Sequence, residues 1–136
     1  MKWDQVVKAQ ITEIMADPKL ATIYGANVRM MGTGTQLVPS LEYMVIGDAE
    51  TELWNPVTIQ WDQWCFTMDD LIASERQLRR IFHQDLPVVM AGLRCWTQYT
   101  DGAPLTAPDR NDFHGRAIRF TVTPLREQYD PVPPPS

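Results

Sequence analysis

The fold is decided by residues 57–83, which read VTIQWDQWCFTMDDLIASERQLRRIFH. Apolar and polar residues alternate at the start of this stretch, the apolar ones being Val57, Ile59 and Trp61. A two-residue period is typical of a strand with one buried face. The apolar residues then resume one position out of phase, at Trp64 and Phe66. Because such a shift turns later side chains to the other face of a sheet, we predict a β-bulge near Asp62-Gln63 that absorbs it.

The same stretch continues into a predicted helix from Asp69 to His83. Thr67 is followed three residues later by Asp70, which is the spacing of a capping box. Glu75 and Arg79 form a favourable pair, four residues apart, on one side of this helix. The other side is apolar and consists of Leu71, Ile72, Leu78, Ile81 and Phe82. Acidic residues begin the helix and basic residues end it, as the helix dipole favours.

Toward the N-terminus, residues 3–15 carry the apolar stripe of an amphipathic helix, and Trp3 belongs to that stripe. Asp17-Pro18 ends this helix and starts a short second one, which Gly25 is suited to terminate. Short strands are predicted at residues 28–30 and 41–46, with loops at residues 31–40 and 47–56.

Toward the C-terminus, residues 88–99 read as one long strand that includes Trp96 as a core residue and in which Gly92 could introduce a kink. A long loop is predicted at residues 100–113 and a closing strand at 118–122. Four of the last six residues are prolines, which predicts an extended tail outside the core.

These elements predict an α+β fold. We expect an antiparallel or mixed β-sheet with two main helices packed on one face, long loops and an extended proline-rich C-terminal tail. A chain of 136 residues fits one domain. We place that domain at residues 1–124 and the tail at residues 125–136.

The composition of the chain argues against several classes of protein. The net charge of −5 argues against a dedicated nucleic-acid binder, which needs a basic surface. No apolar run approaches the roughly 18–20 residues that span a bilayer, so we expect no membrane partner. Polar residues among the first ten positions break any apolar run there, so we expect no signal peptide. We therefore expect folding in a cytosol, with Cys65 and Cys95 as buried free thiols.

The residue patterns that catalysis requires are missing. Only His83 and His114 could serve as a histidine base, and their positions suit a helix end and a strand entrance. No spacing of histidines, cysteines or carboxylates matches a metal site. The loop at Gly32-Thr-Gly34 lacks the lysine and the following helix of a phosphate-binding loop. We expect no enzyme activity, no catalytic residue, no metal and no cofactor.

The tryptophans and the charged loop residues are better explained as protein-contact residues than as catalytic ones. The chain has five tryptophans, and exposed tryptophans often anchor protein interfaces. Trp54 lies in a polar loop and Trp64 beside the predicted bulge, so both are hard to bury, although either could fold back onto its own domain. The candidate interface residues are Trp54, Trp64, Asp48, Glu50, Glu52, Asp101, Asp109 and Arg110.

Four short motifs follow one another along the chain. The first is Ala16-Asp-Pro-Lys-Leu20, and the second is Pro39-Ser-Leu-Glu-Tyr43-Met-Val-Ile-Gly47. The strand that leads into the helix after Thr67 is the third, and the fourth is His114-Gly-Arg-Ala-Ile-Arg-Phe-Thr-Val122. In order and spacing they resemble the tail-terminator (tail-completion) proteins of long-tailed bacteriophages and related gene-transfer particles. The resemblance spans Trp3 to about Thr123 and carries over no site residue.

The resemblance implies a structural virion protein. Such proteins form a ring, usually a hexamer, on the head-proximal end of the tail tube, where the ring ends tube polymerisation and offers a docking face. The partners it implies are further copies of the chain, the tail tube protein and the head-side connector or stopper protein. DNA would pass through the lumen without specific binding. The implied location is the virion tail, after assembly in the host cytoplasm.

Two alternatives remain open. A head-side stopper or another neck joint protein would also be small, mixed in secondary structure and ring-forming. A small ligand-binding module or enzyme would instead use the loops at residues 31–40 and 100–113, with Asp112 and His114 as its polar pair.

Overall fold

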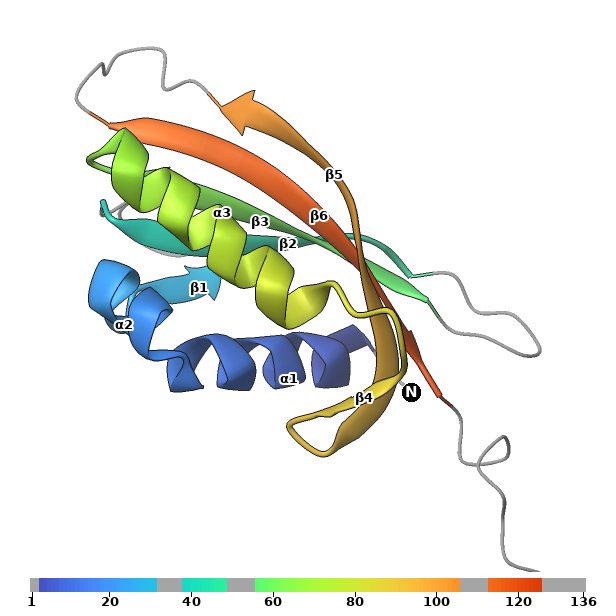
Figure 1. Ribbon diagram of the computed structural model, residues 1–136. Helices are drawn as coiled ribbons and strands as arrows, with labels where there is room; N and C mark the ends of the chain where they lie inside the picture. The colour runs from blue at the N-terminus through green and yellow to red at the C-terminus, as the bar shows by residue number, and fades with distance from the viewer. Residues whose placement is uncertain (1–2, 32–37, 49–55, 106–112, 126–136) are drawn as a thin grey trace, which may run out of the picture.

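The alternating residues form strand β3 (Val57–Cys65), which lies inside the sheet shown in Figure 1. The computed structural model describes residues 3–31, 38–48, 56–105 and 113–125. Among these residues the sheet has six strands. The other five are β1 (Val28–Met30), β2 (Ser40–Asp48), β4 (Val88–Met90), β5 (Leu93–Leu105) and β6 (His114–Pro124). Their order across the sheet is β1-β2-β3-β6-β5-β4. β1 runs parallel to β2, and the other neighbouring pairs are antiparallel.

Three helices lie on one face of the sheet in the described part of the chain (Figure 1). They are α1 (Trp3–Ala16), α2 (Pro18–Tyr24) and α3 (Met68–Phe82). Their predicted start signals are confirmed. Oδ1 of Asp17 accepts hydrogen bonds from the backbone of α2 at 3.0 Å, and the Thr67 hydroxyl accepts one from the Asp70 amide at 3.1 Å. The α+β fold, with a mixed sheet and helices on one face, is therefore confirmed.

The hydrophobic core lies between the helices and the sheet. Trp61 of β3 and Phe82 of α3 are both fully buried, and Phe82 packs edge-to-face on Phe120 with ring centroids 5.4 Å apart. The Trp61 indole N–H donates to Oε1 of Gln10 in α1 at 2.8 Å, so its polar end has a partner. Burying a large apolar side chain stabilises the fold by about 1.5–3 kcal/mol. This core therefore holds α1 and α3 on the sheet.

A polar cluster lies within the core where α2, α3 and β3 meet. Ser74 donates a hydrogen bond to Oε1 of Gln63 at 2.7 Å, and its Oγ lies 2.5 Å from the hydroxyl oxygen of Tyr24. The Tyr24 oxygen also lies 3.4 Å from Sγ of Cys65. Burial raises the pKa of both Tyr24 and Cys65, which keeps both groups neutral. The cluster satisfies buried polar atoms that would otherwise destabilise the core.

The predicted bulge at Asp62-Gln63 is wrong. β3 keeps continuous register with β2 and β6 at these two residues. The regular alternation puts position 63 on the buried face of β3, where an apolar residue was expected, and this position is Gln63. Trp64 points to the opposite face. The hydrogen bond with Ser74 allows this polar residue to be fully buried. The bulges lie elsewhere, between Val45 and Gly47 in β2 and between Tyr99 and Asp101 in β5.

The region predicted as one strand over residues 88–99 is a β-hairpin. Ala91 and Gly92 form its turn with positive φ angles of 48° and 81°, as a type I′ turn requires. Alanine rarely adopts such a φ, so the sequence lacked the usual Asn-Gly signal. β5 then continues to Leu105, and residues 100–105 of the predicted loop are therefore strand. Residues 106–112 lie outside the described residues, as do 32–37, 49–55 and the tail from residue 126.

Three apolar residues assigned to the core are partly exposed: Trp3 at 41%, Ile72 at 50% and Trp96 at 40%. Trp3 and Ile72 lie at the border of a buried helical stripe, where a periodic pattern cannot separate inside from outside. Trp96 alternates with the buried Cys95 and Thr97 of β5, so it lies on the opposite face of that strand. The Trp96 indole donates to the backbone oxygen of Gln84 at 3.1 Å. Both cysteines are free and buried, as predicted.

Candidate assembly surfaces

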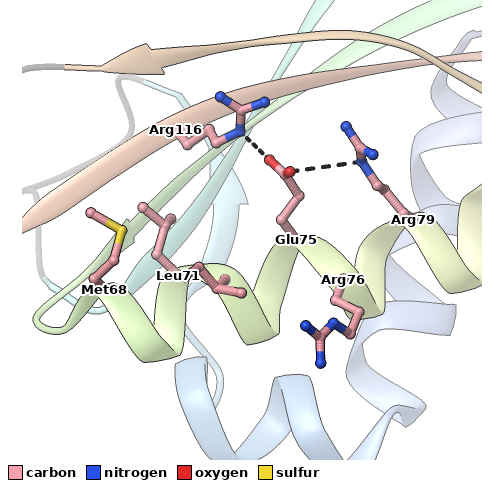
Figure 2. Close-up of a pocket in the computed structure, with 7 residues that line it drawn as sticks. Met68, Leu71, Glu75, Arg76, Arg79 and Arg116 are labelled. Atoms are coloured by element: carbon pink, nitrogen blue, oxygen red, sulfur yellow. Dashed lines mark hydrogen bonds and ion pairs between the residues drawn. The ribbon is translucent and has the colours of Figure 1, made fainter.

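A groove of about 370 Å³ lies on α3 beside β6 (Figure 2). Its apolar wall consists of Met68, Leu71 and Ile72 from the first two turns of the helix. Met68 and Ile72 are 49% and 50% exposed. Large apolar side chains that stay exposed next to one another mark contact surfaces more often than isolated ones do.

The charged wall of the groove is organised by Glu75. Figure 2 shows this carboxylate between two arginines. Nε of Arg116 donates a hydrogen bond to Oε1 of Glu75, and Nε of Arg79 lies 3.7 Å from Oε2. The hydrogen bond to Glu75 raises the pKa of Arg116. The Arg79 guanidinium also lies over the Tyr99 ring, 3.8 Å from its centroid. These contacts hold two positive charges in fixed positions.

Arg76 completes the groove lining, and within the described part of the chain it makes no ion pair. Three arginines and one glutamate leave the lining with a net charge of +2. The whole chain carries −5. The groove is therefore a basic and partly apolar patch on the surface of an acidic protein. It suits an acidic segment that also carries apolar side chains.

The opposite face of the sheet, which we call the outer face, carries a row of polar side chains. Nε2 of Gln60 donates to Oδ1 of Asp62 at 2.8 Å, and Nε of Arg119 donates to Oε1 of Gln60 at 3.0 Å. Glu42 stands opposite Asp62 in the β2–β3 pair and lies 3.7 Å from Nε of Arg29. Side chains of this one chain thus join β1 to β2 and β3 to β6, and the two carboxyl groups of Glu42 and Asp62 face each other between these pairs.

Burial raises the pKa of two carboxyl groups in this row, those of Glu42 and Asp62. The two residues are only 7% and 6% exposed. Arg29 opposes the effect on Glu42, and the hydrogen bond from Gln60 opposes it on Asp62. Desolvation exceeds both, so each group is more readily protonated than a carboxyl group in water.

Two of the predicted interface residues can be placed with their side chains. Trp64 lies half-buried on the outer face and packs edge-to-face on Phe113, with ring centroids 5.4 Å apart. It also covers Gly115, where an added Cβ would lie 2.3 Å from the indole ring. Asp101 is exposed, with Oδ1 3.9 Å from Nε of Arg119. Trp64 therefore contacts its own sheet, and an interface role for either residue stays a prediction.

Asp48 ends strand β2. The remaining predicted interface residues lie outside the described residues, and they are Glu50, Glu52, Trp54, Asp109 and Arg110.

The groove on α3 was not predicted from the sequence. Glu75 and Arg79 were recognised only as a pair on a helix, because Arg116 is 41 residues from Glu75 in the chain. One signal was available: the alternation of the closing strand places Arg116 on the same face as Ile118 and Phe120, toward the helices. Which helical residue would meet it could not be read from that pattern.

The histidines make local contacts. Nδ1 of His83 accepts a hydrogen bond from the Tyr99 amide at 3.0 Å. His114 is half-buried opposite Cys65, and Asp112, its suggested partner, lies outside the described residues. Burial raises the pKa of the Cys95 thiol to about 11, which makes it a poor nucleophile at neutral pH. Among the placed residues, no group of three or more histidines, cysteines and carboxylates could hold a metal ion. None of the helices described is long and apolar enough to cross a membrane.

No protein-family model and no curated protein matches the sequence. Solved structures do share the fold. One of them is a chain of a particle described as "Virion of native gene transfer agent (GTA) particle". The two chains superpose with a TM-score of 0.64 over 88% of this chain and 93% of that one, at 12% sequence identity. At that identity the likeness establishes the shared fold alone.

Proposed function

We propose that this protein is a structural component of a phage-like particle, and that its specific role is that of a tail terminator. The observation that carries the proposal is the fold shared with a chain of a gene transfer agent virion, which covers nearly the full length of both chains. The order of the sequence motifs, from Ala16-Asp-Pro to His114-Gly, favours the tail-terminator role over other virion roles.

In this role, copies of the chain form a ring, expected to be a hexamer, on the head-proximal end of the tail tube. The ring ends tube polymerisation and presents a docking face to the head-side connector. A ring of identical subunits needs two different, complementary surfaces on each copy. The groove on α3 has the mixed basic and apolar character of one such surface.

Particles made without this protein provide the direct test. We expect tails longer than normal, because nothing stops tube polymerisation, and few tails joined to heads. Electron microscopy of the particles measures both quantities, and a supplied copy of the gene should restore normal length. Tails of normal length beside heads that leak DNA would assign the protein to the head-side stopper role instead.

The purified protein allows a second test. We expect it to assemble into a ring, either alone or on the tail tube protein, as mass measurement and negative-stain imaging would show. A strict monomer at high concentration that also fails to bind tube protein would contradict the proposal. His114→Ala should leave assembly nearly unchanged, whereas loss of function in that variant would favour the ligand-binding alternative.

A further inference from the structure

Two features at opposite ends of the molecule match each other in charge and in apolar character. One is the groove on α3. The other is the segment at residues 48–55, which joins β2 to β3 and reads DAETELWN. It contains three carboxylates, from Asp48, Glu50 and Glu52, followed directly by Leu53 and Trp54.

We propose that residues 48–55 of one copy dock in the α3 groove of a neighbouring copy. The carboxylates lie beside the arginines of the groove, and Trp54 packs on Met68 and Ile72. This inference rests on the proposed function, because it names the surface through which the copies of the ring meet.

Charge makes the groove a selective acceptor for this segment. Copies that each carry −5 repel one another, so their association needs local patches of opposite sign. The groove lining is +2, and Arg79 and Arg116 share the single carboxylate of Glu75. Arg76 has no carboxylate partner among the placed residues. Three carboxylates from a second copy would satisfy these guanidiniums.

The apolar part of the match provides affinity. Met68 and Ile72 are about half exposed on the free chain, and they would lose that exposure under a tryptophan ring. Tryptophan, with tyrosine and arginine, is enriched among the few residues that dominate the binding energy of an interface. The acidic residues and Trp54 therefore act together, the former selecting the groove and the latter holding the contact.

Distance excludes docking within one copy. The segment joins β3 at Val57, whereas α3, whose first turns carry Met68 and Ile72, begins beyond the other end of that strand (Figure 1). The nine residues of β3 span about 26 Å at roughly 3.3 Å per residue. Asp48 and Val57 are paired neighbours, and the nine Cα steps between them allow a loop to reach about 15–16 Å at most. Trp54 can therefore reach Met68 and Ile72 only in another copy.

The resulting contact is head-to-tail. Each copy offers its acidic segment at one end and its groove at the other, so both surfaces of every copy are used once when the assembly closes. A heterologous contact of this kind forms a ring when the rotation between copies closes.

Disulfide trapping tests the contact directly. Asn55→Cys and Asp69→Cys are introduced together into the full chain, whose own two cysteines are buried. These positions adjoin Trp54 and Met68 and leave the apolar contact itself intact. Oxidised glutathione is added to the protein and to purified particles. We expect a ladder of linked copies on a non-reducing gel, extending to the number of subunits in the ring. Asn55→Cys combined with Leu86→Cys is the control, since Leu86 is 74% exposed but outside the groove. It should give no ladder.

Charge reversal gives an independent readout. Arg76→Glu should weaken self-association by about tenfold or more, as loss of a close charge pair commonly does, and Glu52→Lys should do the same. The two changes together should restore much of the affinity. Arg80→Glu, on the same helix but outside the groove, is the matched control and should have little effect.

The outcomes separate this inference from the proposed function. Rings that form with normal affinity in Arg76→Glu, together with no ladder from the Asn55–Asp69 cysteine pair, overturn the inference and leave the tail-terminator role standing. A ladder that appears only when Tyr129→Cys replaces Asn55→Cys overturns it in favour of the proline-rich tail as occupant. Tails of normal length without the protein overturn the proposed function itself.

Discussion

The two charged regions of this molecule, on opposite faces of the sheet, are built in contrasting ways. On the outer face, Glu42 and Asp62 are almost completely buried and are contacted by Arg29 and Gln60 of the same chain. In the α3 groove, the side chains of Arg79 and Arg116 remain 44% and 31% exposed. Half-exposed apolar residues lie next to them.

The difference shows that charge alone does not identify a docking surface. A carboxylate that is buried among partners of its own chain affects the stability of the fold and makes that stability depend on pH. A guanidinium that stays exposed beside exposed apolar carbon is available to a second molecule. Changes on the outer face should therefore alter stability, and changes in the groove should mainly alter association.

The largest effect on stability is expected from Gly115→Ala. The new Cβ would overlap the Trp64 ring that covers this position, and overpacking of this kind costs about 1–3 kcal/mol. Thermal or denaturant unfolding measures the loss. Gly47→Ala is the control on the same sheet, since no atom lies within 4 Å of the Cβ it would add. Equal stability of the two variants would mean that Trp64 does not pack on Gly115.

A smaller, pH-dependent effect is expected from Asp62→Asn. Because burial raises the pKa of Asp62 and Glu42 in the folded state, the folded chain binds these protons more tightly than the unfolded chain. Their contribution to stability is fully present below the ordinary carboxyl pKa of about 4, and it is lost as pH rises through the raised folded-state values. Asparagine keeps the acceptor for Gln60 without the charge, so the variant should be more stable than the parent at neutral pH.

That gain should disappear on acidification, as unfolding curves recorded across the pH range would show. Asp101→Asn removes an exposed carboxylate from the same face and should change stability little at any pH. A variant Asp62→Asn that is less stable than the parent at neutral pH would show that the charged carboxylate stabilises the outer face.

The smallest effect on stability is expected from Glu75→Gln. The variant removes the negative charge between Arg79 and Arg116, but both guanidiniums are partly exposed to water, so the loss should be about 1 kcal/mol or less. Self-association should strengthen instead, because the groove becomes more positive. Denaturation and sedimentation measure the two quantities, with Arg80→Gln as control. If the free energy of unfolding fell by several kcal/mol instead, the charged groups of the groove would mainly affect the stability of the fold, as those of the outer face do.

Much of the fold was predictable because its signals are local. The helix-capping residues Asp17 and Thr67 lie within a few residues of the atoms they bind. The alternation in β3 likewise identifies the buried face of that strand. The hairpin at Ala91-Gly92 was missed because its turn lacks the usual residues. The bulge was wrongly placed because a buried Gln63 interrupts the apolar pattern without interrupting the strand.

Less of the candidate site was predictable. The acidic residues and Trp54 stood out in the sequence as exposed contact residues, and their role stays a prediction. The groove could not be predicted from the sequence, because its lining depends on which residues of α3 lie next to Arg116 in the folded chain. Ile72 appeared as a core residue by its spacing, although it is half exposed in the groove.

The sequence by itself determined the α+β class, the caps and length of α3, and the acidic, tryptophan-containing segment before β3. Each of these depends on neighbouring residues, on the period of the apolar pattern or on composition. Only the tertiary structure decided that Gln63 is buried, that the sheet bulges in β2 and β5, and that Arg116 joins Glu75 across 41 residues. Such contacts are selected by the packing of whole faces against one another, which no local pattern along the chain records.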